Sequence, residues 1–228
     1  MEATLLNQSD NGQIKLREIS LFNWGSFADL HTAHIDPNGT LITGDNGAGK
    51  STLVDGLMAL LMPPSRANFN IAAAQNDKAD RTILSYMRGS YGQEHDGTTT
   101  ATKSKRSQKV VTGLRAYYRQ DNGNDITLIA LFWADNTATS ASDVKRLYLV
   151  ANRDVKLKTV LAEFDEKYDR TFKTWLESQH IKHMTTFDEY QKLYQEILHL
   201  NNKNAPALLS RALGLKKIDN LTDLIRTL

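Results

Sequence analysis

Residues 44–52 have the sequence GDNGAGKST, which matches the phosphate-loop pattern G-x-x-x-x-G-K-[S/T] at every fixed position. Glycines in such a loop let successive backbone N–H groups turn inward around phosphate oxygens, and the N-terminal end of the following helix adds positive potential. A glycine-rich turn with no ligand is the alternative interpretation. The pattern therefore predicts a phosphate-binding loop between a strand and a helix.

The side chains of this loop have different expected roles. Lys50 is expected to reach the β- and γ-phosphates, and the hydroxyl of Ser51 is expected to bind Mg²⁺. Thr52 is placed to help hold the α-phosphate. The residues expected to contact the nucleotide from this loop are Asn46, Gly47, Ala48, Gly49, Lys50, Ser51 and Thr52.

Both flanks of the loop fit a strand–loop–helix unit. Residues 40–43 are expected to form a short buried strand entered through the turn 36–39, because its proline presets φ and its Asn-Gly pair tolerates positive φ. Residues 51–62 carry leucines at helical spacing and stop before a Pro-Pro pair. Upstream, residues 14–22 alternate apolar and polar side chains as a half-buried strand does, and residues 31–35 predict a weaker second strand.

Downstream of the loop the hydrophobic pattern changes. Residues 110–118, 126–133 and 146–150 are β-rich runs, the first two joined by the turn 120–124, and they predict an antiparallel sheet. From Thr159 onward the apolar period is about 3.6 residues, which is typical of helices.

The remaining segments complete the expected organisation. The polar stretch 93–108 has few apolar side chains and is expected to be a mobile loop. Residues 186–189 have the form of a capping box ahead of an apolar helical pattern. The expected segments are a P-loop core (14–92), the mobile loop (93–108), antiparallel hairpins (109–152) and a helical segment (157–228).

Composition excludes several classes of protein. With 228 residues, 40% hydrophobic and 24% charged, the chain can bury a core as one or two domains. It has neither a long apolar run nor an apolar N-terminus, so we expect a soluble cytoplasmic protein without a membrane span or signal peptide. The absence of cysteine excludes disulfides, cysteine-ligated zinc and thiol nucleophiles. A net charge of +2 is too small to indicate nucleic-acid binding by itself.

The loop and its surroundings resemble a known family. The form G-x-N-G-[A/S]-G-K-S-T is that of ABC-type ATPases, including the SMC proteins, and residues 16–27 followed by a hairpin resemble the start of SMC, RecN and MukB heads. The Asn23-Trp24-Gly25 element and residues 68–92 resemble the MukB-like condensins, and most closely the JetC-type subunits of Wadjet plasmid-defence complexes. Residues 205–228 again resemble the segment that leads into the coiled coil of such proteins.

This resemblance implies a fold and a set of ligands. The fold is α/β, the N-terminal half of an ABC/SMC-type P-loop ATPase head with an antiparallel β-subdomain and a helical C-terminal part. The ligands are ATP and Mg²⁺. The Walker B strand and the signature loop are not found here, so the resemblance implies that a C-terminal half beyond a coiled coil supplies them. This fragment alone is then expected to bind ATP without turning it over.

The resemblance also implies partners and a role. Two heads would engage around ATP, and hydrolysis would drive DNA loop extrusion or clamping on double-stranded DNA, near the nucleoid or a plasmid. Kleisin and KITE-type subunits and a nuclease subunit would complete a plasmid-defence complex, with no membrane involved. The alternatives are a chromosome-condensing MukB-like protein or a DNA-repair ABC ATPase, and a self-contained P-loop NTPase or kinase with Asp135 as its acidic residue. A protein-interaction module with a degenerate loop is opposed by the intact Lys50 and Ser51.

The chain departs from the family after its first strand. Many SMC-type heads carry a basic residue there that touches the nucleotide, whereas this chain has Gly25. That contact is either lost or made by Asn23 or Trp24. Stacking of Trp24 on adenine is one hypothesis, and burial of its ring beside the sheet is the other.

An arginine downstream is a further candidate. Residues 85–89 resemble the S-x-x-R-G segment of SMC heads, in which the arginine reaches toward phosphate in the engaged dimer. Arg88 is therefore the candidate catalytic arginine, with Arg81 behind it, because a guanidinium can donate two parallel hydrogen bonds and keeps its charge. The alternative is an arginine paired with a surface carboxylate.

Several weaker sequence patterns have both a functional interpretation and a purely structural one. Residues 128–135 imitate a Walker B strand but lack its glutamate, and residues 89–93 imitate the signature loop in the wrong chain order. His180 and His183 have helical spacing but no third metal ligand, which indicates a surface pair. Gln75 is a weak candidate for a glutamine loop.

A basic stretch forms the last candidate. It could bind DNA phosphates without sequence preference, or its side chains could simply be solvated. Tyr117 and Tyr118 lie within it. Its cations are Lys103, Lys105, Arg106, Lys109, Arg115 and Arg119.

Overall fold

The computed structural model describes residues 12–63, 82–96, 99–121 and 123–200, together with residues 202, 205 and 208. Its main feature is a six-stranded sheet in the order β2-β1-β5-β6-β7-β8, in which every pair of neighbours is antiparallel. The strands are β1 (Ile14–Trp24), β2 (Phe27–His34), β5 (Val110–Gln120), β6 (Asp125–Ala134), β7 (Lys145–Ala151) and β8 (Lys182–Met184).

The strands predicted at 14–22, 110–118, 126–133 and 146–150 are present. β5, β6 and β7 form the expected antiparallel meander, and the β5–β6 turn has Gly123 at φ 92°, a conformation that favours glycine. β6 is apolar from Leu128 to Ala134, where both of its faces are covered. Leu128 and Phe132 belong to the core on one side of the sheet, and Leu131 belongs to the core on the other.

Two segments that were separate in the expected organisation share this sheet. β1 pairs with β5 from Ile14 opposite Gln120 to Phe22 opposite Gly113. The P-loop core and the β-hairpins are therefore one hydrogen-bonded unit, and the end of β1 carries the chain toward the glycine loop.

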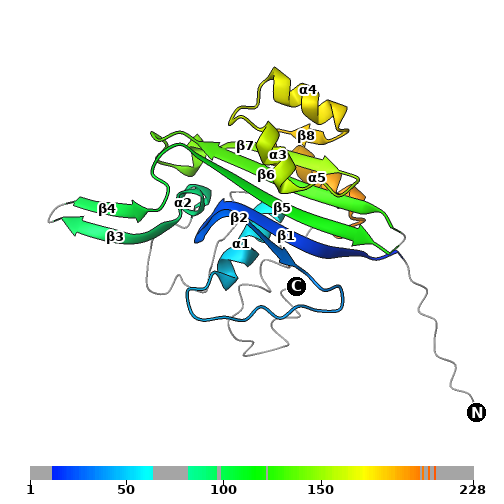
Figure 1. The fold of residues 1–228 in the computed structure, drawn as a ribbon, viewed down its shortest axis with the longest axis horizontal. Coiled ribbons are helices and arrows are strands. Elements are labelled where there is room, and N and C mark those ends of the chain that lie inside the picture. Colours follow the sequence, from blue (N-terminus) through cyan, green and yellow to red (C-terminus); the bar gives the residue numbers. More distant parts are fainter. Residues whose placement is uncertain are drawn as a thin grey trace, which may run out of the picture.

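Helices cover both faces of the sheet. α1 (Lys50–Leu61), α2 (Ile83–Arg88) and α5 (Phe187–Ile197) contribute to the larger core, and α3 (Leu157–Glu163) and α4 (Arg170–Ser178) to the smaller one. Figure 1 shows α1 below the sheet and α4 above it. A short 3₁₀ helix, η2 (Ala141–Asp143), lies between β6 and β7.

The expected strand at 40–43 is wrong. These residues form no regular strand, and the side chains of Leu41 and Ile42 are 86% and 39% exposed. A strand needs a neighbour that pairs with its backbone and covers its side chains. Within the described part of the chain, no strand of either sheet pairs with this segment.

The expected loop at 93–108 is largely a hairpin. β3 (Ser90–Asp96) pairs with β4 (Thr99–Ser104), and Figure 1 shows this hairpin projecting away from the main sheet. Low apolar content excludes a core of its own, but it does not prevent backbone pairing of β3 with the threonine-rich β4.

The described part of the C-terminal segment contains α3, α4 and α5, with the short strand β8 between the last two. α5 begins at Phe187 with Thr186 as its N-cap residue, and Thr186 donates to the Glu189 carboxylate at 2.6 Å. Residues 205–228, which were expected to lead into a coiled coil, lie almost wholly outside the described residues. No described helix is long and apolar enough to cross a membrane.

Candidate nucleotide-binding site

The glycine loop ends at a sharp entry into α1. Gly49 is the N-cap residue, with φ 93° and ψ 11°, a left-handed conformation. A Cβ on Gly49 would lie 3.0 Å from Cζ of Phe27 and 3.1 Å from Oγ of Ser26. Both the backbone angle and the close approach of the β1–β2 turn therefore require glycine here.

The first turn of α1 offers backbone donors to an anion. The amide of Leu53 donates to the carbonyl of Gly49 at 3.0 Å. The amides of Lys50, Ser51 and Thr52 come before this bond, so the helix ladder does not use them. No acidic residue lies in the first turn, and the positive end of the helix dipole remains available to a phosphate.

Lys50 folds back over the loop. Its ammonium donates to the carbonyl oxygens of Gly44 at 2.7 Å and Asp45 at 2.8 Å. These acceptors are neutral, so a phosphate can compete for the ammonium more readily than it could against a carboxylate. On the open side of the loop, a Cβ on Gly47 would meet nothing within 4 Å. The donor set and this open cradle fit a phosphate group.

Ser51 is the candidate ligand for Mg²⁺ in this loop. It lies in the first turn of α1 and is exposed. Mg²⁺ prefers six oxygen ligands, several of them from water and phosphate. No group of three or more His, Asp or Glu side chains in the described ranges could hold a metal. A metal bound at Ser51 would therefore take its remaining ligands from the nucleotide, water and other parts of the protein.

Trp24 lies beneath the loop rather than beside a base. Its ring is fully buried, its Nε1 donates to the carbonyl of Thr52 at 3.0 Å, and it stacks on Tyr86 with centroids 4.6 Å apart. The hypothesis of stacking on adenine is therefore wrong for this structure, because both ring faces are enclosed by the core. The other hypothesis, burial beside the sheet, is confirmed.

The side chain of Asn23 is also hydrogen-bonded to other parts of the fold. It lies in a bulge of β1 with φ 51°, donates through Nδ2 to the carbonyl of Val111 at 3.1 Å, and accepts from the amide of Asp29 at 3.2 Å. Thr112 Oγ1 donates to its carbonyl at 2.8 Å. The predicted nucleotide contact is therefore corrected: this side chain shapes the bulge that ends β1.

Arg88 is held in a cage of backbone carbonyls. Its guanidinium has six of them within 3.5 Å, in the segments 106–108 and 135–138, the shortest being 2.7 Å to Ser107. This arrangement occupies the donors of Arg88 within the single chain, and the expected catalytic contact in an engaged dimer stays a prediction. The arrangement also differs from the alternative of a carboxylate partner. Arg81, the residue behind it, lies outside the described residues.

The basic stretch does not form one patch. Lys109 pairs with Glu166 at 2.7 Å, and Arg119 lies 3.7 Å from Asp125. Arg106 donates to the carbonyls of Met87 at 2.6 Å and Gly25 at 2.9 Å. Most of these cations are paired with groups of the fold, so they make no continuous basic surface, and DNA contact by this stretch stays a prediction.

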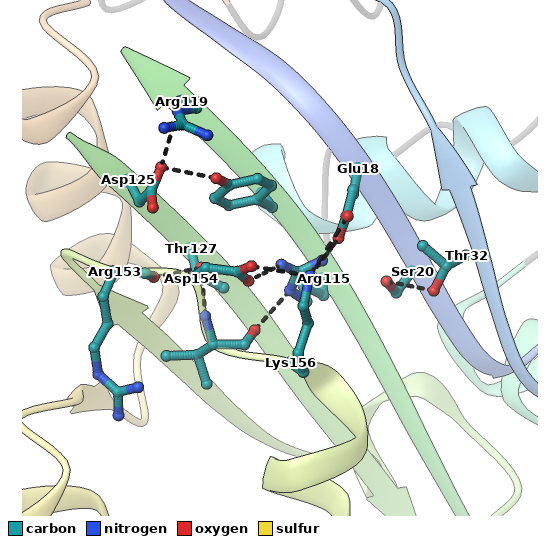
Figure 2. Close-up of polar contacts among 12 residues, drawn as sticks. Glu18, Ser20, Thr32, Arg115, Arg119, Asp125, Thr127, Arg153, Asp154 and Lys156 are labelled. Carbon is teal, nitrogen blue, oxygen red and sulfur yellow. Dashed lines mark hydrogen bonds and ion pairs between the residues drawn. The ribbon is translucent and has the colours of Figure 1, made fainter. Parts of the chain in front are cut away.

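Arg115 is the most deeply buried member of that stretch, with 1% of its side chain exposed. It bonds Glu18 at 2.7 Å and Asp154 at 2.5 Å, and Lys156 approaches both carboxylates (Figure 2). Burial raises the pKa of the Glu18 carboxyl, but hydrogen bonds from Arg115 and Lys156 together outweigh it and hold that pKa below its usual value. The network joins β1, β5 and the segment after β7.

One buried carboxylate was missed by the sequence analysis. Asp55 lies on α1, one turn after Ser51, with 6% of its surface exposed, and it accepts a short hydrogen bond from the hydroxyl of Tyr86. The signal was present, since Asp55 interrupts the apolar face of the predicted helix. Its position behind the loop makes it a positioning group for α1.

The weaker candidates have structural roles. Residues 128–135 are part of β6 and its end, where Asp135 lies 3.4 Å from Lys145. Gly89 caps α2 in the left-handed conformation. His180 follows α4 and His183 lies in β8, bonded to the Tyr168 hydroxyl at 2.6 Å, so the pair does not share a helix. Gln75 lies outside the described residues.

The glycine loop, the lysine folded over it and the open N-terminal turn of α1 together define a P-loop nucleotide-binding domain. In agreement, residues 16–76 match the family model described as the P-loop containing region of AAA domain.

Two curated proteins add to this assignment. The chromosome partition protein MukB of Haemophilus ducreyi (strain 35000HP / ATCC 700724) is 30% identical over 167 residues, which cover 71% of this chain and 10% of MukB. The Retron Vc95 probable ATPase of Vibrio cholerae serotype O1 biovar El Tor is 38% identical over 52 residues, 23% of this chain and 10% of that protein. The chain thus spans about a tenth of the length of these relatives. The matches support an SMC-like P-loop ATPase.

Proposed function

We propose that this chain is the ATP- and Mg²⁺-binding N-terminal half of an SMC-like ATPase head. The observation that carries the proposal is the geometry at the start of α1, where Lys50 bridges two loop carbonyls and Gly49 sets the entry angle. On binding, the ammonium of Lys50 would exchange these carbonyls for the β- and γ-phosphates, and Ser51 would offer its hydroxyl to Mg²⁺.

The head would be completed by a segment outside this chain. Leu41 and Ile42, directly before the glycine loop, are exposed apolar side chains without a strand beside them in the described residues. A strand from a C-terminal half, ending in the acidic residues that hold Mg²⁺ and activate water, would pair there. Asp135, the candidate for such an acid among the described residues, directly follows a strand of the antiparallel meander and lies 3.4 Å from Lys145.

Two such heads would close around ATP, and hydrolysis would release them. We propose that this cycle acts on double-stranded DNA, by loop extrusion or clamping. The named role of MukB in chromosome partition supports an action on DNA. Within that class we favour plasmid defence with kleisin, KITE-type and nuclease partners, on the residues that resemble JetC-type subunits. Chromosome condensation is the alternative.

ATP hydrolysis by the chain alone tests whether it holds only half of the catalytic site. Purified chain would be assayed for release of phosphate from Mg-ATP, with Lys50→Ala as control and duplex DNA added to one series. We expect binding that depends on Lys50 and no turnover in either series. Steady Lys50-dependent hydrolysis by the monomer would contradict the proposal that a C-terminal half is needed, and would favour a self-contained P-loop NTPase.

A further inference from the structure

A second cation lies beside the glycine loop, on a segment far from it in sequence. Lys105 follows β4, and its Nζ donates to the carbonyl of Ser26 at 3.3 Å. Ser26 in turn touches the loop, since its Oγ is 3.1 Å from where a Cβ on Gly49 would lie. The neighbouring Gly25 is packed as closely against Thr52, whose Cγ2 is 2.5 Å from the corresponding Cβ position. The turn that Lys105 contacts therefore runs along the first turn of α1.

The backbone that carries Lys105 is fixed to the end of α2, and the side chain of the next residue bonds the β1–β2 turn. The amide of Lys105 donates to the carbonyl of Gly89 at 3.4 Å, and that of Arg106 donates to the carbonyl of Arg88 at 3.0 Å. The guanidinium of Arg106 also reaches the carbonyls of Gly25 at 2.9 Å and Tyr86 at 3.2 Å. Lys105 thus starts from an anchored backbone, while its side chain is exposed.

The ammonium of Lys105 has only a neutral acceptor among the contacts found for it. The ion pairs of the described residues include Lys109, Arg115 and Arg119 but not Lys105. A phosphate is a stronger acceptor for an ammonium than a carbonyl is. An anion on the first turn of α1 would therefore draw Lys105 from Ser26.

We propose that Lys105 contacts the phosphates of the bound nucleotide, as a second cation beside Lys50. This inference rests on the proposed function, because it needs a nucleoside di- or triphosphate in the glycine loop. Gly25 has no side chain, and the side chains of Asn23 and Trp24 are bonded within the fold, so these three residues offer no cation to a nucleotide. Lys105 would supply that cation from a neighbouring segment. The contact is made to phosphate, and the nucleoside does not take part.

The test compares the affinities of ATP, ADP and adenosine for the wild type, Lys105→Ala and Lys105→Arg, by equilibrium dialysis at two salt concentrations. Lys105→Ala should weaken ATP and ADP about tenfold, as expected for the loss of one hydrogen bond to a charged group, and leave adenosine unchanged. Lys105→Arg should keep most of the affinity. The salt dependence of ATP binding should be smaller in Lys105→Ala.

Lys182→Ala is the matched control, because Lys182 is an exposed lysine in β8, at the opposite edge of the sheet from β2. If Lys105→Ala binds ATP as tightly as the wild type while Lys50→Ala does not bind it, this inference is overturned and the proposed function stands. An equal loss in Lys182→Ala would also overturn it, since the effect would then come from net charge. Absence of Lys50-dependent binding in the wild type would overturn both.

Discussion

The indole Nε1 of Trp24 donates a 3.0 Å hydrogen bond to the backbone carbonyl of Thr52, in the first turn of α1. The same ring stacks on Tyr86, whose hydroxyl donates to the buried carboxylate of Asp55 one turn further along α1. The helix that carries the glycine loop is thus tied at two levels to β1 and α2. These contacts hold the N–H groups of the loop at a fixed distance from the sheet.

Tyr86→Phe should destabilise the protein by about 2 kcal/mol, because the buried Asp55 carboxylate loses a hydrogen bond from a neutral donor. Urea unfolding would measure this as a lower midpoint with an unchanged slope. Tyr91→Phe is the control, since Tyr91 is 66% exposed and should change stability by less than about 0.5 kcal/mol. Equal effects of the two changes would show that the Tyr86–Asp55 bond contributes nothing.

Gly49→Ala should be more damaging than Gly123→Ala, although the two glycines have nearly the same φ, 93° and 92°. At Gly123 a Cβ meets nothing within 4 Å, so the cost is the left-handed backbone alone, about 1 kcal/mol. At Gly49 the Cβ also pushes on Phe27 and Ser26. Thermal unfolding and ATP binding should separate the variants: only Gly49→Ala should lose affinity. Loss of ATP affinity in both variants would contradict the assignment of the loop at Gly49 as the phosphate-binding site.

Arg115→Ala should cost about 3 kcal/mol, because it leaves Glu18 and Asp154 with Lys156 as their remaining cation. Arg119→Ala is the control on the same strand: Arg119 is 57% exposed and 3.7 Å from Asp125, and an exposed pair of this kind contributes less than about 1 kcal/mol. Urea unfolding of both variants measures the difference. A cost for Arg115→Ala no larger than that of its control would show that the buried network adds no stability.

Tyr194 should make the protein sensitive to alkali. Burial raises the pKa of its phenol from 10 to about 12, and its hydroxyl donates to the carbonyl of Leu61 at 2.7 Å. The folded state therefore holds this proton more tightly than the unfolded state. Its contribution is complete below pH 10 and falls by about 2–3 kcal/mol as the pH rises to about 12.

Tyr194→Phe should reduce the slope of unfolding free energy against pH between 10 and 12, whatever its effect at neutral pH. Unfolding by urea at several pH values gives both slopes. Identical slopes in the wild type and Tyr194→Phe would contradict the assignment.

Local features of this fold could be predicted because they depend on nearby residues. The alternation in β1, the β-rich run of β5, the spacing of leucines in α1 and the glycine at the β5–β6 turn are all visible in short windows. The lysine and glycines of the loop have fixed spacing, so their place at the start of a helix was also predictable.

The roles of single polar and aromatic residues could not be predicted, because distant partners decide them. Trp24 bonds a carbonyl 28 residues away, and Arg115 bonds carboxylates 39 and 97 residues away. In the sequence, Arg115 looks the same as the exposed Arg119. The same reason explains why the basic stretch resembled one patch although its members lie apart in the fold.

Pairing partners account for the two errors in secondary structure. The apolar pattern at 40–43 predicted a buried strand, but Leu41 and Ile42 are exposed because no described strand pairs with this segment. The polar stretch 93–104 has few side chains for a core, yet β3 and β4 satisfy each other's backbone groups. The apolar pattern of a segment predicts which side chains could be buried, and it does not predict which strands pair.

Equilibrium binding of Mg-ATP to the wild type and to Lys50→Ala tests the central claim most directly. The Lys50 ammonium contacts only carbonyl oxygens of the loop in the hydrogen bonds found for it, at 2.7 and 2.8 Å, so its replacement should leave the melting temperature nearly unchanged. We predict saturable binding to the wild type and at least about a hundredfold weaker binding to Lys50→Ala. Equal affinities of the two folded proteins would contradict a nucleotide site in the loop at 44–52.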